Sequence, residues 1–285
     1  MSDALQTGIL YVVGTPIGNL EDMTFRAVRI LKTVDAIAAE DTRHTGKLLQ
    51  HFQIATPQIG YHEHNRQQRT PELIEKLTEG KSLALVTDAG MPLISDPGYE
   101  LVAACIEAGI KVVPIPGCNA AIVALSAAGL PTDRFVFEGF LAAKGTQRRD
   151  RLEALQAESR TFILYEAPHR LKQTLQDLAN TLGEERQIVL GRELTKLYEE
   201  FWRGTIKEAI EHYSQKEPQG EFTLVVAGAQ LEKPHLSEAA LKAELQQLLA
   251  RGISRSEASR QLAKATSLPR RPIYQLALTL PSPEL

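Results

Sequence analysis

The sequence predicts an α/β protein, with two domains built on mostly parallel, helix-covered sheets and a small helical segment after them. First, short apolar runs alternate with helical patterns along most of the chain, which is typical of strands joined by crossover helices. Second, several of these runs end at loops rich in glycine and proline, residues that mark turns. Third, a length of 285 residues suits two domains and a short extra piece.

The first half of the chain contains five predicted strands and four predicted helices. The apolar runs predict strands at Gly8–Val13, Ala36–Ala39, Gln58–Tyr61, Leu83–Val86 and Lys111–Ile115. Helical patterns cover Phe25–Thr33, a segment from Thr70 to Gly80, Tyr99–Ala108, and a segment that follows Pro116–Ala120 and ends at about Ala128. The second of these helices has Thr70 as its predicted N-cap and Pro71 in the first turn.

The second half repeats this alternation after a break at Gly129–Pro131, where we place a domain boundary. Strands are predicted at Phe135–Phe137, Thr161–Tyr165, Gln187–Leu190 and Phe222–Ala227, and the clearest helix is Arg170–Thr181. Two further helical patterns, Ser237–Arg251 and Ser254–Ala265, follow a linker at Glu232–Pro234. The predicted domains are therefore residues 1–128, 129–231 and 235–285.

Composition and charge exclude several classes of protein. Hydrophobic residues make up 43% and charged residues 24%, which is ordinary globular usage and argues against disorder. The net charge of −3 argues against a globally basic nucleic-acid binder, although a local basic face is still possible. The sequence has no long apolar run, no secretory leader pattern and only two cysteines, so we expect no membrane span, no disulfide framework and a cytoplasmic location.

Three loops directly follow predicted strands of the first half: Gly14–Leu20, Thr87–Gly98 and Pro116–Ala120. Ligands of open α/β sheets bind beyond the carboxyl ends of the strands, so these loops predict a small-molecule site. The first loop, GTPIGN, matches neither the P-loop nor the dinucleotide fingerprint. Alone, it is equally compatible with a plain connecting turn.

The loop Thr87–Gly98 is the strongest single indication of a binding site. It holds two Asp, two Gly and two Pro within twelve residues, whereas a plain connection of this kind needs only about 2–6 residues. The segment Glu40–Arg43 also follows a predicted strand and places acids beside a cation. It could be a catalytic pair or a surface ion pair of little energetic weight, and the motif alone favours the surface pair.

Taken together, the segments resemble the tetrapyrrole methylase family, and most closely its ribosomal RNA ribose methyltransferase branch. The resemblance covers about residues 10–228, with the matching segments in the family's order. The segments are LYVVGTPIGNLEDMTFRA, AEDTRHT, LALVTDAGMPLISDPGYELV, PIPGCNAA, FEGFL, LYEAPHRL and RELTKLYEEFWRG.

The resemblance implies two α/β domains with the active site in the cleft between them. It also implies S-adenosylmethionine as methyl donor, a homodimer, and methylation of a cytidine ribose 2′-hydroxyl in the decoding region of 16S rRNA, with the assembled small subunit as the expected partner. The family's donor contacts, carried over position by position, fall on Pro16, Asp88, Gly90, Pro92, Ile94, Ser95, Cys118, Asn119, Tyr165, Ala167 and Thr223.

For the reaction, we expect Asp41 to act as base or orienter, with Arg43 and Lys144 positioning phosphate or stabilising the oxyanion. RNA contacts are expected from basic residues of two segments: Arg148, Arg149, Arg151, Arg255 and Arg260. The first of these segments could instead be a solvated helix start. No metal site is expected, because His62 and His64 lack further ligands at defined spacing.

Two other functions stay open from the sequence. One is methylation of a small tetrapyrrole-like substrate, which does not need the basic stretch at Lys144–Arg151 or the C-terminal helical segment. The other is a non-catalytic RNA-binding or ribosome-assembly factor that retains the fold. Binding of S-adenosylmethionine separates this last class from the enzymes.

Overall fold

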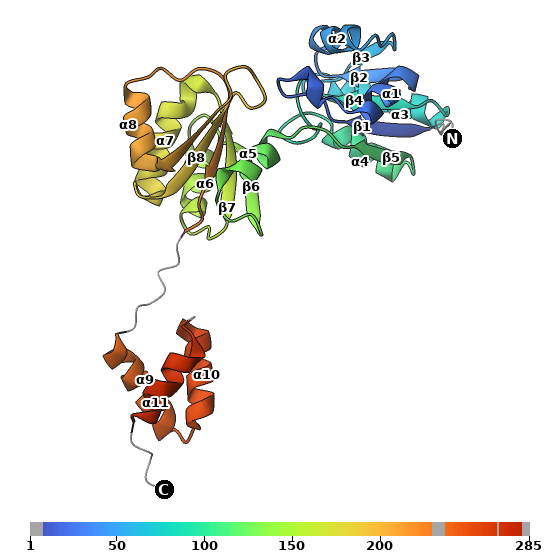
Figure 1. Cartoon of the computed structure of the whole chain (residues 1–285). Coiled ribbons are helices and arrows are strands. Elements are labelled where there is room, and N and C mark those ends of the chain that lie inside the picture. Colours follow the sequence, from blue (N-terminus) through green and yellow to red (C-terminus); the bar gives the residue numbers. More distant parts are fainter. Residues whose placement is uncertain (1–7, 230–236, 267, 281–285) are drawn as a thin grey trace. The chain divides into compact units, whose positions relative to one another are not determined.

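The computed structural model describes residues 8–229, 237–266 and 268–280. The chain divides into two compact units, Met1–Ala229 and Gln230–Leu285. The larger unit contains two separate five-stranded sheets, which Figure 1 shows as two groups of strands with their own helices. The predicted α/β class and the predicted C-terminal helices are confirmed. The predicted linker Glu232–Pro234 lies outside the described residues.

The first sheet is parallel throughout, with the strand order β3-β2-β4-β1-β5. Its strands are β1 (Ile9–Val13), β2 (Ala36–Ala39), β3 (Gln58–Gly60), β4 (Leu83–Val86) and β5 (Lys111–Ile115). All five were predicted to within one residue at either end. Their parallel direction brings the carboxyl ends of β1, β4 and β5 to one edge, where the three loops singled out above begin.

Helices cover both faces of this sheet, because its strands are apolar on both sides. The helices are α1 (Phe25–Thr33), α2 (Thr42–His51), α3 (Arg66–Thr78) and α4 (Tyr99–Glu107), with a 3₁₀ turn at Leu20–Asp22. Alternate β1 side chains divide between two cores. Tyr11 and Val13 pack with α1 and Leu49 of α2, whereas Leu10 packs with α3 and α4.

The predicted start of α3 at Thr70 and Pro71 is wrong, because the helix begins at Arg66 and contains Pro71. A hydrogen-bonded turn directly before Arg66 allows the helix to begin earlier than predicted. The Asn65 side chain accepts from the His62 N–H (2.9 Å) and donates to the Gly60 carbonyl (3.1 Å). Thr70, the expected cap, instead lies within hydrogen-bond distance of the buried Tyr61 hydroxyl at 3.2 Å.

The second sheet has the order β6-β7-β10-β8-β9 and is mixed rather than mostly parallel. Its strands are β6 (Phe135–Phe140), β7 (Thr161–Glu166), β8 (Gln187–Arg192), β9 (Glu200–Thr205) and β10 (Phe222–Val226). Only the β6–β7 pair is parallel, since β10 runs antiparallel to both its neighbours and β8 runs antiparallel to β9. The expectation of a mostly parallel second sheet is therefore wrong, and the edge strand β9 was not predicted.

Three helices cover one face of the second sheet: α6 (Thr146–Gln156), α7 (Pro168–Leu182) and α8 (Ile206–Ser214). In Figure 1, α7 and α8 lie side by side in yellow and orange. The other face is covered by α5 (Ala120–Ala128), whose Ala124 and Leu125 pack against Ile163 and Val225. The predicted domain boundary assigns α5 to the first domain, whereas its core contacts lie on the second sheet.

The smaller unit contains the helices α9 (Glu238–Ala250), α10 (Arg255–Thr266) and α11 (Arg270–Leu278). Side chains such as Leu245, Leu262 and Ile273 form its own buried core. Helix α11 was not predicted, because Pro272 near its start resembles a break. A proline is tolerated there, since first-turn N–H groups have no helical partner. No helix among the described residues is long and apolar enough to cross a membrane.

Candidate active site

The loops Gly14–Leu20 and Thr87–Gly98 are bonded to each other at the edge of the first sheet. The Thr15 N–H donates to the Gly90 carbonyl (2.9 Å), and the Gly90 N–H donates to the Thr15 carbonyl (3.1 Å). The buried Thr15 hydroxyl also donates to the Thr87 carbonyl at 3.2 Å. The two loops therefore form one backbone platform.

The third loop joins this platform through two glycines in direct contact. A Cβ built on Gly14 would lie 2.7 Å from the Gly117 Cα and 2.6 Å from the Met91 sulfur. A Cβ on Gly117 would lie 2.6 Å from the Gly14 Cα. Glycine is required at both positions because backbone lies where a side chain would begin.

Replacing Gly14 by alanine should therefore lower the free energy of unfolding by about 1–3 kcal/mol, the usual cost of overpacking. Urea denaturation of the purified protein measures this change. Gly46→Ala is the matched control: Gly46 lies inside α2, and a Cβ there would make only an ordinary contact, at 3.5 Å, with the Gln58 side-chain nitrogen, so alanine should be neutral or stabilising. Equal stability of the two variants would contradict the close packing of the loops.

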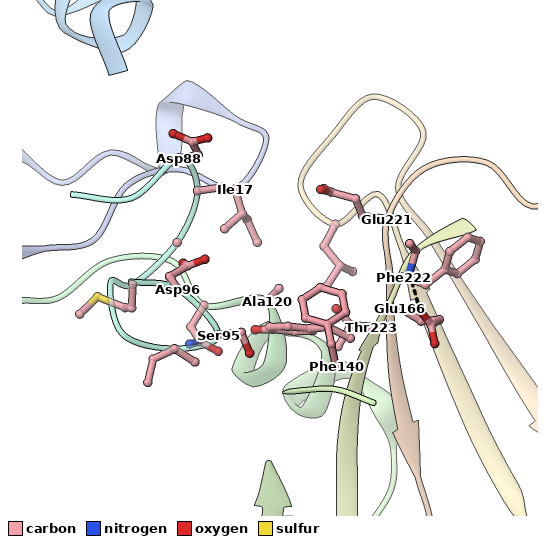
Figure 2. A pocket seen from close by; sticks show the side chains of 18 of the residues that line it. Ile17, Asp88, Ser95, Asp96, Ala120, Phe140, Glu166, Glu221, Phe222 and Thr223 are labelled. Carbon is pink, nitrogen blue, oxygen red and sulfur yellow. Dashed lines mark hydrogen bonds between the residues drawn. The ribbon is translucent and has the colours of Figure 1, made fainter. Parts of the chain in front are cut away.

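A cavity of about 550 Å³ lies against this platform and extends to the second sheet. Its lining from the first half includes Ile17, Glu40, Asp88–Met91, Ile94–Asp96, Asn119 and Ala120. Its lining from the second half includes Phe140, Tyr165–His169, Leu194, Lys196 and Glu221–Thr223. Figure 2 shows Asp88, Ser95 and Asp96 on one side of the pocket, with Glu166, Glu221 and Thr223 on the other. This volume is in the range of about 300–1,000 Å³ typical of small-molecule sites.

Most of the residues predicted to bind the donor line this cavity. They are Asp88, Gly90, Ile94, Ser95, Asn119, Tyr165, Ala167 and Thr223. Pro16, Pro92 and Cys118 are not among the lining residues. Pro16 and Pro92 are buried within the loops, and the Cys118 thiol lies 3.8 Å from the Asp22 carbonyl oxygen. We therefore infer that these three residues set the shape of the loops.

Three carboxylates, Glu40, Asp88 and Asp96, line the side of the cavity formed by the first half of the chain. The Asp88 N–H donates to the Glu40 carboxylate at 3.3 Å. Burial raises the pKa of Asp96 to about 7; repulsion from Glu40 and Asp88 adds to the rise, and the Thr87 hydroxyl opposes it. Burial also raises the pKa of Glu40. Asp96 can therefore hold or release a proton near neutral pH.

Two loops at the cavity carry backbone strain. Leu93 and Ser95 have φ angles of 74° and 64° in the loop after β4, and Glu193 and Thr195 have φ angles of 48° and 66° after β8. Non-glycine residues rarely adopt such angles, and those that do cluster at functional sites. This strain is a second, independent indication that the cavity is functional.

Asp41 and Arg43 lie beside the cavity but do not line it. The Asp41 carboxylate caps α2 by accepting from the Arg43 N–H (2.8 Å), and it pairs with the Arg43 guanidinium (2.6 Å). Hydrogen bonds from the Arg43 side chain and backbone hold the pKa of Asp41 well below its usual range. The Asp41 N–H donates to the Asp88 carboxylate at 3.2 Å, which suits an orienting role better than a role as base.

The basic stretch after β6 divides into exposed and buried residues. Lys144 and Arg149 are exposed, and the half-exposed Arg151 side chain pairs with the buried Glu138 carboxylate. Arg148 is only 7% exposed and pairs with Asp177 at 2.7 Å. Its guanidinium is enclosed, so the expectation that Arg148 contacts RNA does not fit its position.

The two predicted RNA contacts of the smaller unit lie on α10. Arg260 is exposed and pairs with Glu257 at 2.6 Å. The Arg255 guanidinium donates to the Leu280 carbonyl at 2.7 Å, which ties the start of α10 to the residues that follow α11. No group of three or more His, Cys, Asp or Glu side chains in the described part of the chain could hold a metal ion.

The chain is similar to known proteins in sequence and in fold. The family model for Tetrapyrrole (Corrin/Porphyrin) Methylases matches residues 9–210. The chain is 62% identical to the ribosomal RNA small subunit methyltransferase I of Synechocystis sp., with 96% of this chain and 98% of the relative covered. It is 50% identical to the protein of the same name from Halalkalibacterium halodurans, with 94% of each covered.

Among solved structures, it resembles uroporphyrin-III C-methyltransferase from Thermus thermophilus complexed with S-adenosyl homocysteine. The TM-score is 0.55 at 17% identity, and the match covers 77% of this chain and 96% of the other. At that identity the likeness concerns the fold alone. From the sequence matches, the chain belongs to the tetrapyrrole methylase family, in the branch of the ribosomal RNA small subunit methyltransferases I.

Proposed function

We propose that the chain transfers a methyl group from S-adenosylmethionine to the ribose 2′-hydroxyl of a cytidine in the decoding region of 16S rRNA. The observation that carries this proposal is the 62% identity, over nearly the full length of both chains, to a ribosomal RNA small subunit methyltransferase I. Family membership supports methyl transfer in general, and the branch supports RNA as the acceptor rather than a tetrapyrrole.

The cavity fits the donor in size and chemistry. S-adenosylmethionine supplies a methyl group on a positively charged sulfur together with ribose hydroxyls. Carboxylates such as Asp88 and Asp96 suit a cation and accept hydrogen bonds from hydroxyls, and Ile17, Ile94 and Phe140 offer apolar surface. Asp88, Gly90, Ser95, Asn119 and Thr223 are the residues that we expect to hold the donor. Alignment of the acceptor oxygen with the methyl group could supply up to roughly 7–11 kcal/mol of the rate enhancement.

Asp96 is the group best suited to take the proton of the ribose hydroxyl. It lines the cavity, and its pKa of about 7 is where a general base is most effective in neutral solution. Asp41 and Arg43 act through Asp88 and not on the substrate directly. The Asp41 N–H donates to the Asp88 carboxylate, so the Asp41–Arg43 pair orients this lining group. Lys144, exposed after β6, would contact phosphate.

The charge distribution supports RNA binding by the smaller unit. Residues 230–285 contain eight Lys and Arg against five Asp and Glu, although the whole chain has a net charge of −3. The larger unit is therefore acidic and would repel a polyanion at long range, so local cations must attract it. Arg255 and Arg260 in the smaller unit, with Arg149 and Arg151 in the larger, are the expected phosphate contacts.

The proposal extends to the assembled small subunit as substrate, a homodimer and a cytoplasmic location. Exposed apolar side chains on two helices support self-association: Tyr99 and Ile106 of α4 are 71% and 66% exposed, and Ile122 of α5 is 51% exposed. Tyr99 and Ile106 lie seven residues apart and so share one face of α4, and exposed apolar surface of this kind is typical of protein interfaces.

Mapping ribose methylation in 16S rRNA by mass spectrometry tests the function in cells. In cells that lack this chain, we expect one decoding-region cytidine to lose its 2′-O-methyl group, and the wild-type chain to restore it. A chain with Gly90 replaced by valine serves as the site-disrupted control, because Gly90 lies at φ 89° against the cavity. Unchanged methylation at every decoding-region cytidine would overturn the proposal.

A further inference from the structure

Among the described residues that line the cavity, Lys196 is the only lysine or arginine. The other charged lining groups are carboxylates from both halves of the chain: Glu40, Asp88, Asp96, Glu166 and Glu221. Arg170 offsets Glu166 in an ion pair of 3.3 Å, but a polyanionic acceptor would still meet several carboxylates in this cavity. Among the described lining residues, Lys196 is the one lysine or arginine that could offset them.

The Lys196 ammonium keeps one donor available. It donates to Glu193 at 2.8 Å and to Glu221 at 2.7 Å, and an ammonium group has three N–H donors. The third has no partner among the described residues. Burial lowers the pKa of Lys196, but the two ion pairs outweigh burial and raise it overall, so the side chain stays charged at neutral pH.

The two partners of Lys196 differ in how firmly they are held. The Glu193 carboxylate is 18% exposed and also accepts from the Glu221 N–H at 2.9 Å, so it is fixed. The Glu221 carboxylate is 81% exposed, and exposed ion pairs contribute little free energy. An anion of the substrate can therefore replace Glu221 at the ammonium while Glu193 keeps the lysine in place.

The position of Lys196 is fixed by both halves of the larger unit. A Cβ on Gly18 would collide with the Lys196 Cγ and would lie 3.1 Å from the Thr195 hydroxyl oxygen. The lysine stem thus packs against the loop Gly14–Leu20, on the platform beside the expected donor. The strained φ angles of Glu193 and Thr195 (48° and 66°) place Lys196 at this junction.

We propose that Lys196 binds a backbone phosphate of the RNA next to the methylated nucleotide, displacing the exposed carboxylate of Glu221. The inference rests on the proposed function, because it requires RNA as the acceptor. It replaces Lys144 with Lys196 as the cation nearest the reaction. It also assigns Glu221 a role as a competing anion that weakens RNA binding.

The proposal predicts opposite effects for the two partners of one ion pair. Lys196→Met removes a phosphate contact, so the slope of log affinity against log salt should become shallower by about 0.7–0.9. The ratio of wild-type to variant affinity should then fall by about threefold between 50 and 200 mM salt, because of this difference in slope. Glu221→Gln removes the competing anion, so it should bind RNA more tightly than wild type.

The chain offers a matched control pair in Lys172 and Glu217. They form an ion pair of the same 2.7 Å length, with exposures of 46% and 75%, and neither residue lines the cavity. Lys172→Met and Glu217→Gln therefore change the net charge by the same amounts as the test variants. They should leave the salt slope unchanged, which separates a local contact from general electrostatics.

The measurements are RNA affinity at several salt concentrations, KM and kcat for methylation, and donor affinity by calorimetry. We expect Lys196→Met to raise KM for RNA, with donor affinity within twofold of wild type. An unchanged salt slope, a loss confined to donor affinity, or weaker RNA binding by Glu221→Gln would overturn the inference. If wild type itself neither binds nor methylates the RNA, the proposed function has failed instead.

Discussion

Replacing Asp96 by asparagine should lower the rate of methyl transfer by about 10²–10⁴-fold, the usual contribution of a general base. Asparagine has nearly the same shape but cannot accept the proton of a ribose hydroxyl. Asp96 lines the cavity beside Glu40 and Asp88, and burial raises its pKa to about 7. The wild-type rate should therefore rise about tenfold per pH unit below pH 7 and level off above it.

Single-turnover methylation between pH 5.5 and 8.5 measures both effects. The variant should lose the rise that is centred near pH 7, and donor affinity should be retained. Asp133→Asn is the control, because Asp133 is exposed and does not line the cavity. A variant at Asp96 with wild-type rate and pH profile would show that another group takes the proton.

The stability of Asp96→Asn shows whether a slower reaction reflects loss of the base or loss of the folded structure. The pKa of Asp96 lies above its ordinary value, so ionising this group costs stability as the pH rises from about 4 to about 7. Asparagine does not ionise and should avoid this cost. Asp96→Asn should therefore be at least as stable as wild type at pH 8, and its advantage should be smaller at pH 5.

Replacing Arg148 by methionine should lower the free energy of unfolding by about 3–5 kcal/mol, the cost of breaking a buried ion pair from one side. The guanidinium donates to Asp177 (2.8 Å), the Thr174 hydroxyl (2.9 Å) and the Ala142 carbonyl (3.0 Å). The Thr174 hydroxyl in turn donates to the buried Glu166 carboxylate at 2.6 Å. Methionine would leave several buried polar groups without a partner.

Urea denaturation measures this loss, with Arg149→Met as the neighbouring control. Arg149 is exposed, and substitutions at such positions usually stay within about 0.5 kcal/mol. Arg148→Met combined with Asp177→Leu should recover part of the stability, because no single charge is then left buried. Equal stability of Arg148→Met and Arg149→Met would show that the Arg148 guanidinium is not buried. A contact between Arg148 and RNA would then again agree with its position.

Much of the first sheet could be predicted from sequence. Its strands are fully apolar runs closed by loops with strong turn residues, as at Gly14 after β1, so their position and length follow from local pattern. The second sheet has equally apolar strands, but their direction depends on how distant segments pair. Nothing local to Phe222–Val226 indicates that this strand lies between β7 and β8.

The edge strand β9 was not predicted, and the role of the basic stretch that begins α6 was left open, for a different reason. Glu200–Thr205 mixes charged, aromatic and small residues because an edge strand has few buried neighbours. Helix α6 begins with the basic stretch that we interpreted as an RNA contact or a solvated helix start. One of its cations, Arg148, is neutralised by Asp177, which lies 29 positions further along the chain. Charge patterns along a sequence do not reveal such pairing.

The loops singled out from the sequence line the cavity, but the sequence did not reveal how several other lining groups act together. Asp88 and Asn119 lie in loops that directly follow strands, where ligand contacts are expected. Asp96 lies in the same predicted loop, yet its altered pKa depends on burial and on two other carboxylates. Lys196 and Glu221 come from loops separated by strand β9 and helix α8, and only the tertiary fold brings them together.

The most direct test of the central claim is methylation with purified components. Small ribosomal subunits from cells lacking this chain are incubated with the protein and methyl-labelled S-adenosylmethionine, and the RNA is then digested to nucleosides. We predict that the label appears as 2′-O-methylcytidine, at one decoding-region position. Label on a base, or no label on RNA despite donor binding by the folded protein, would contradict it.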